Sequence, residues 1–151
     1  MRALFLCVAP LALLGCGSSS GGGPVAANWL GTFNADVDQT ETCPVSGMHV
    51  DTLTGTITVV AGSNSGTIVT QPGSNSCNLT WTVNGNNATL DSAQTCPTVP
   101  GSVGGTWTPT FTAGTLVLNG TSIEVNNTGT AVFVDNGTQN CTFTQAGTFT
   151  P

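Results

Sequence analysis

His49 and Asp51 are the first residues whose types could support catalysis, because a histidine beside a carboxylate resembles part of a serine-hydrolase triad. His49 is the single histidine of the chain, and no Gly-x-Ser-x-Gly elbow accompanies it. We therefore interpret His49 as a solvated loop residue. A carboxylate pair from the seven acidic residues could instead serve glycoside hydrolysis, although the chain has no Tyr and only three Trp to form sugar platforms. We predict a protein that is not an enzyme, with a hydrolase using a carboxylate or His49-based site as the alternative.

The densest group of oxygen ligands is a candidate calcium site. It consists of Asn34, Asp36 and Asp38, at alternating positions of a predicted strand, together with Glu41. Carboxylate and amide oxygens suit Ca²⁺, but the sequence lacks the glycine of a calcium loop. We interpret the cluster as the solvent face of the first strand and predict no metal and no cofactor.

Basic side chains are almost absent. The sequence has one Lys or Arg, which is Arg2, against seven Asp and Glu, and a net charge of −6. A surface without cations cannot neutralise phosphates, so nucleic acid is excluded as a partner. Electrostatic attraction to anionic lipid headgroups is excluded for the same reason.

The N-terminus has the pattern of an export signal. Arg2 precedes an apolar run of about 12 residues, too short for a hydrocarbon core that needs about 20. The run ends in Leu13-Leu14-Gly15-Cys16, which resembles the lipobox of bacterial lipoproteins, with Leu14 bulkier than the residue usual there. The resemblance implies cleavage before Cys16 and a covalent lipid on that cysteine, which anchors the protein to a membrane.

The same resemblance implies a place in the bacterial cell envelope. Residue 17 is not Asp, which by analogy favours the outer membrane, on either its periplasmic or its external side. The glycine- and serine-rich run 17–23 has the composition of a flexible tether. We therefore divide the chain into a signal peptide (1–15), a lipidated cysteine with its tether (16–28) and an all-β domain (29–151).

Four cysteines remain in the predicted domain. An even number in an exported protein predicts two disulfides, and the wide spacing disfavours zinc. Similar segments at 39–44 and 94–97 suggest an internal duplication and favour Cys43–Cys77 and Cys96–Cys141, while the other two connectivities stay open.

Apolar and polar residues alternate along most of the domain, as in residues 77–83, which predicts antiparallel strands with one buried face. Asn-Gly pairs at 84, 119 and 136 predict hairpins. We predict an all-β antiparallel meander of about ten strands, forming a barrel or a sandwich. The predicted strands are 29–38, 53–60, 66–71, 77–83, 87–92, 105–112, 114–118, 121–125, 129–134 and 140–149.

Residues 29–33 (Trp-Leu-Gly-Thr-Phe) faintly resemble the opening of lipocalin-type barrels, with Phe33 where the family has Trp. The resemblance implies a meandering barrel. Strand parity places all four cysteines and the longest loops, 39–52 and 92–104, at the end of the domain remote from the membrane. We predict a non-enzymatic structural or binding module that engages an envelope protein or a small uncharged ligand through these loops.

Overall fold

The computed structural model describes residues 27–73, 77–101 and 104–151. A short 3-10 helix, η1 (Ala27–Trp29), precedes the first strand. Within these ranges the chain forms ten strands, so the prediction of an all-β antiparallel fold with about ten strands is confirmed. They are β1 (Gly31–Cys43), β2 (Gly47–Ala61), β3 (Thr67–Pro72), β4 (Leu79–Asn84), β5 (Asn87–Leu90), β6 (Gln94–Thr95), β7 (Val99–Pro100), β8 (Thr106–Asn119), β9 (Ser122–Val134) and β10 (Thr138–Thr150).

Eight of the described strands form a closed antiparallel ring. Their order is β5-β4-β3-β2-β1-β10-β9-β8, and β5 pairs with β8 to complete the circle, through Asn87–Thr89 and Thr115–Val117. The short β6 and β7 add to the 106–111 part of β8, beyond this closure. The sequence left barrel and sandwich open, and this ring-like sheet is a barrel.

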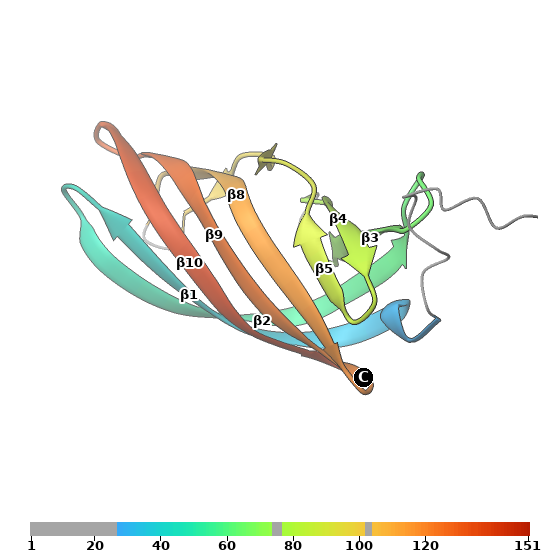
Figure 1. Ribbon diagram of the computed structural model, residues 1–151. Helices are drawn as coiled ribbons and strands as arrows, with labels where there is room; N and C mark the ends of the chain where they lie inside the picture. The colour runs from blue at the N-terminus through green and yellow to red at the C-terminus, as the bar shows by residue number, and fades with distance from the viewer. Residues whose placement is uncertain (1–26, 74–76, 102–103) are drawn as a thin grey trace, which may run out of the picture.

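The ring is longer on one side than on the other. Strands β1, β2, β8, β9 and β10 have 13 to 15 residues, whereas β3, β4 and β5 have 4 to 6 (Figure 1). Strand β2 pairs with β3 only through Ile57–Ala61, so among the described residues its 47–56 part pairs with β1 alone. The barrel wall is therefore complete at one end and split along one side at the other.

We call these two ends the closed end and the open end. The closed end carries the turns at 62–66, 85–86 and 120–121, and the open end carries those at 44–46 and 135–137. Trp29 lies at the closed end, where it is 0% exposed and its indole Nε1 donates a hydrogen bond to the Gly85 carbonyl oxygen at 3.1 Å. The side chain thus seals the closed end beneath the β4–β5 turn.

Several predicted boundaries are wrong in the same way. Predicted strands 105–112 and 114–118 are one strand, β8, with an irregularity between Phe111 and Ala113. Predicted strands 121–125 and 129–134 are likewise one strand, β9. The predicted loop 39–52 is wrong as well, because β1 and β2 continue through it to a turn at 44–46. In β9 and in the β1–β2 hairpin, polar residues that we placed between strands lie inside paired strands.

The described cysteines form two disulfides, as predicted, but with different partners. Cys43 is joined to Cys141 and Cys77 to Cys96, so the favoured pairs Cys43–Cys77 and Cys96–Cys141 are wrong. Ring closure makes the first and last long strands neighbours, which brings Cys43 beside Cys141 at the ends of β1 and β10. All four cysteines lie toward the open end, so the prediction that they share one end of the domain is confirmed.

Candidate functional site

A cavity of about 540 Å³ lies inside the barrel and reaches its split side. Its volume falls in the range of small-molecule sites. The wall is formed mainly by apolar side chains that alternate inward along the strands. Its aromatic members are Trp81, Trp107, Phe111, Phe133 and Phe149.

Two edges border the cavity on the split side. Residues 51–56 of β2 form one edge, and 96–101, which include β7, form the other. The Cys77–Cys96 disulfide ties the second edge to the chain just before β4. Leu53 lies on the face of β2 that points into the barrel. It is nevertheless 42% exposed, because the short β3 does not extend far enough to cover it.

A row of polar side chains crosses the inner wall. Asp51, Gln39, Gln145 and Asn127 lie directly opposite one another on β2, β1, β10 and β9. Asn127 Nδ2 donates to Gln145 Oε1 at 3.0 Å, and Gln145 Nε2 donates to Gln39 Oε1 at 2.7 Å. Gln39 Nε2 then donates to Glu41 Oε1 at 2.6 Å. We call Asn127, Gln145, Gln39 and Glu41 the amide chain.

The carboxylate of Glu41 sets the direction of the amide chain. An ionised carboxylate only accepts hydrogen bonds, so Gln39 must present its NH₂ group to Glu41, and each amide behind it is oriented in turn. The carbonyl oxygen of Asn127 is left at the far end. Asn127 is 5% exposed, and its Oδ1 is the buried side-chain atom that has no hydrogen-bond partner within the described ranges.

Gly114 makes room for that end of the chain. A Cβ atom on Gly114 would lie 2.4 Å from Asn127 Oδ1 and 2.9 Å from Trp81 Cζ3. Both distances are far below van der Waals contact, so any larger residue would displace the amide or the indole. The glycine therefore leaves room for both the Asn127 side chain and the Trp81 ring. Trp81 is fixed by its own Nε1, which donates to Thr70 Oγ1 at 3.0 Å.

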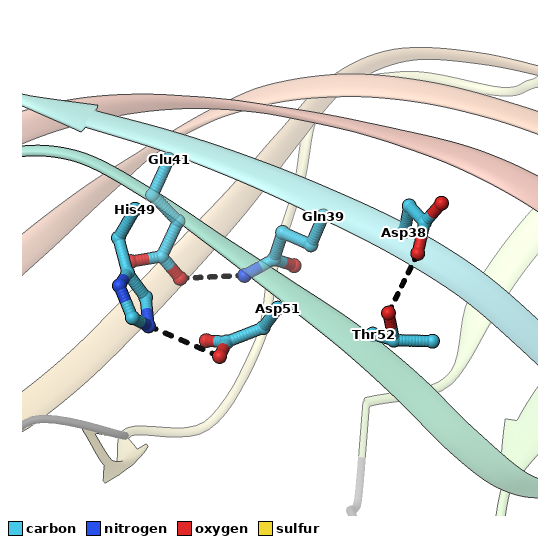
Figure 2. Close-up of polar contacts among 6 residues, drawn as sticks. All are labelled: Asp38, Gln39, Glu41, His49, Asp51 and Thr52. Atoms are coloured by element: carbon cyan, nitrogen blue, oxygen red, sulfur yellow. Dashed lines mark hydrogen bonds and ion pairs between the residues drawn. The ribbon is translucent and has the colours of Figure 1, made fainter.

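Glu41, His49 and Asp51 lie together at the other end of the amide chain (Figure 2). His49 Nε2 and Asp51 Oδ1 are 3.0 Å apart, with side chains 43% and 30% exposed. Glu41 is directly opposite His49 on β1. Partial burial raises the pKa of Glu41, and the nearby charge of Asp51 adds to this, while the Gln39 hydrogen bond and His49 lower it. His49 is thus a partly exposed strand residue hydrogen-bonded to Asp51, and the prediction that it lies in a loop is wrong.

The four calcium candidates are not brought together. Asn34, Asp36 and Asp38 share the exposed outer face of β1, whereas Glu41 has the opposite parity and lines the cavity. Asn34 Nδ2 donates to the Pro151 carbonyl, and Asp38 Oδ1 accepts from Thr52 Oγ1 at 2.8 Å. The part of the chain that the structure describes holds no group of three or more His, Cys, Asp or Glu side chains arranged for a metal ion.

Three members of the amide chain, Gln39, Gln145 and Asn127, were not singled out in the sequence. The alternation of inward-facing residues predicts Gln145, because it follows Cys141 and Phe143 at every second position of β10. Gln39 and Asn127 lay in segments that we interpreted as a loop and a turn.

Comparison with protein-family models, with curated proteins and with solved structures finds no match to this chain. The predicted lipidation site Cys16 lies outside the described residues. No helix in the described ranges has the length and apolar character that a membrane crossing requires.

Proposed function

We propose that the protein is a non-enzymatic binding module that holds a small, largely apolar molecule inside the barrel. The observation that carries this proposal is the cavity of about 540 Å³, walled by aromatic and aliphatic side chains and reached from the split side. Eight-stranded barrels have an interior wide enough for one small ligand. Burial of about 200 Å² of apolar ligand surface would contribute roughly 5 kcal/mol before the costs of association.

Titration of the full chain with 1-decanol, free of detergent, tests this proposal. Trp81 and Trp107 line the cavity, so their fluorescence is expected to change saturably as the alcohol binds. We expect little difference in affinity between low and physiological salt, because decanol carries no charge. Failure to bind decanol up to its solubility limit would contradict the proposal.

A pair of matched variants locates the binding. Ala35 lines the cavity, whereas Ala146 is exposed on the outer face of the neighbouring strand β10. Ala35→Phe should fill part of the cavity and weaken decanol binding, and Ala146→Phe should leave it unchanged. Equal effects of the two variants would place the ligand elsewhere.

We further propose that Cys16 carries the lipid that attaches this module to a bacterial envelope membrane, most consistently the outer one. The support is the Leu13-Leu14-Gly15-Cys16 motif and the two disulfides, which are typical of exported proteins. Cys16→Ser should move the protein out of the membrane fraction. Recovery of that variant in membranes at the level of the unaltered protein would contradict the anchor.

We also propose that this domain is similar to lipocalin-type barrels, which residues 29–33 resemble. This proposal is supported by the eight-stranded meander and by Trp29, which is buried at the closed end just before β1.

A hydrolase is the second candidate, and one observation favours it. Burial raises the pKa of Glu41, and Asp51 lines the same cavity, so two carboxyl groups in different surroundings face one space. Pairs of this kind serve glycoside hydrolysis. Turnover of a chromogenic glycoside that disappears in Glu41→Gln would favour this candidate over the binding module.

A further inference from the structure

The cavity contains negative groups that the chain itself does not neutralise. Glu41 and Asp51 both line it. The sequence has no Lys and only Arg2, so His49 is the one side chain of residues 3–151 of a basic type. No other side chain of residues 3–151 supplies a positive charge to the cavity.

Of the two cavity carboxylates, Glu41 makes no ion pair with the described residues, although the charge of the opposite His49 lowers its pKa. The one cation-forming side chain nearby, His49, is hydrogen-bonded to Asp51 at 3.0 Å. The neighbours of Glu41 in the sheet are His49 on β2 and Phe143 on β10, and Phe143 brings no charge. The hydrogen bond from Gln39 is neutral, and Asp51 repels the Glu41 charge. A half-buried carboxylate in such surroundings is stabilised by an added cation.

The amide chain makes the cavity richer in acceptors than in donors. Each of Asn127, Gln145 and Gln39 uses an N–H group on the next member, and the chain ends on the Glu41 carboxylate. At the other end, within the described ranges, the buried Asn127 Oδ1 has no donor. The Trp81 Nε1–H group likewise already donates a hydrogen bond, to Thr70 Oγ1. A ligand that complements this wall supplies hydrogen-bond donors.

We propose that the ligand is an organic amine whose ammonium group binds Glu41, with Asp51 beside it, and whose apolar body lies against Trp81, Trp107 and Phe111. This inference rests on the proposed binding function and specifies its ligand class. An ammonium group donates up to three charge-assisted hydrogen bonds and is also attracted to aromatic ring faces. Fatty acids and other anionic amphiphiles are repelled by the same carboxylates. The sequence predicted an uncharged ligand, and the position of Glu41 inside the cavity is the reason for this different expectation.

Three probes with one apolar chain and different head groups test the ligand class. Decylamine, 1-decanol and decanoate should be titrated against the full chain at pH 7.5 and low salt, each below its aggregation concentration. We expect decylamine to bind at least about tenfold more tightly than decanol, because a hydrogen bond to a charged group adds over 1 kcal/mol. Decanoate should bind more weakly than decanol.

Two matched variants assign the preference to Glu41. Glu41→Gln keeps a hydrogen-bond acceptor for Gln39 and removes the charge, so decylamine should fall to the affinity of decanol while decanol is unchanged. Asp38→Asn removes one charge from the outer face of the same strand and should keep the full amine preference.

The outcomes separate this inference from the proposal on which it rests. If decanol and decylamine bind equally well, or if decanoate binds best, the amine inference is wrong and the binding function stands. If the amine preference persists in Glu41→Gln, Glu41 is not the counter-ion and the inference is wrong. If none of the three probes binds, the proposed function itself fails.

Discussion

At the closed end of the barrel Trp29, Ile68 and Leu116 are 0% exposed, whereas at the open end the inward-facing Leu53 is 42% exposed and Asp51 is 30% exposed. The closed end is complete because β5 pairs with β8 and Trp29 seals it. At the open end the long strands continue on one side of the barrel, whereas on the other side β3 pairs only with residues 57–61 of β2 and leaves the wall incomplete. The comparison shows that one antiparallel meander can have a tightly packed apolar core at one end and accessible polar side chains at the other.

Among the single substitutions, Trp29→Ala should produce the largest loss of stability. Removing a fully buried tryptophan costs about 3–5 kcal/mol in free energy of unfolding, because the cavity left behind is only partly filled. Leu53→Ala at the open end should cost less than about 1 kcal/mol, since the side chain is already largely in water. Urea denaturation of both variants measures the difference. Equal losses would mean that the two ends do not differ as described.

The closed end follows well from the sequence because its residues obey the alternation rule. Apolar residues recur at every second position there, and Asn84-Gly85 and Asn119-Gly120 mark its turns. In both turns the glycine follows the last strand residue, with φ of 61° and 66°, a conformation that glycine adopts without steric cost. Local patterns of this kind are sufficient to specify a hairpin.

The open end could not be predicted in the same way. Gln39 and Asn127 are buried at 8% and 5% exposure, but polar residues at inward positions have the same sequence pattern as a loop. Their burial is stabilised by hydrogen bonds to Gln145, and the bond between Gln145 and Gln39, which lie 106 residues apart in sequence, exists only once β10 has paired with β1. The Cys43–Cys141 pairing depends on the same closure. Local periodicity therefore carried no signal for either feature.

Removing the Cys77–Cys96 disulfide should lower both the stability of the protein and its affinity for decanol. The bridge spans a sequence separation of 19, for which the chain-entropy estimate is about 3 kcal/mol. The Cys77→Ala/Cys96→Ala variant should also weaken decanol binding, because the bridge holds one edge of the cavity. The Cys43→Ala/Cys141→Ala variant is the control: by the same estimate it should lose more stability, about 4.7 kcal/mol, because its bridge spans a sequence separation of 98, yet Cys43 and Cys141 do not line the cavity, so decanol binding should be retained. A similar loss of decanol affinity in both variants would show that the effect is general loosening.

Gly114→Ala tests the boundary between the two ends. The added methyl group would meet Asn127 Oδ1 and the Trp81 ring, and overpacking of this kind costs about 1–3 kcal/mol. Gly137→Ala is the matched control, because nothing lies within 4 Å of its Cβ position. Thermal unfolding should separate the two variants clearly. Identical melting temperatures of the two variants would mean that the barrel accommodates a methyl group at Gly114 without loss of stability.

Glu41→Gln should have the smallest effect on stability, and the opposite sign. Burial raises the pKa of Glu41 above its ordinary value of 4.5, so the folded protein holds this proton to a higher pH than the unfolded chain does. Stability therefore falls as the pH rises from the unfolded pKa through the folded one, and ionised Glu41 is destabilising at neutral pH. The variant should melt a few degrees higher at most at pH 7.5.

The pH dependence of this gain distinguishes its cause. The difference between Glu41→Gln and the unaltered protein should vanish below about pH 4.5, where the carboxyl is protonated in both states. The outward Asp38→Asn should show no such gain, because its carboxylate lies in water on the opposite face of β1. A stabilised Glu41→Gln that has also lost its preference for decylamine would show that Glu41 is retained for binding at a cost in stability. A Glu41→Gln that melts lower at neutral pH would instead assign Glu41 to the stability of the open end.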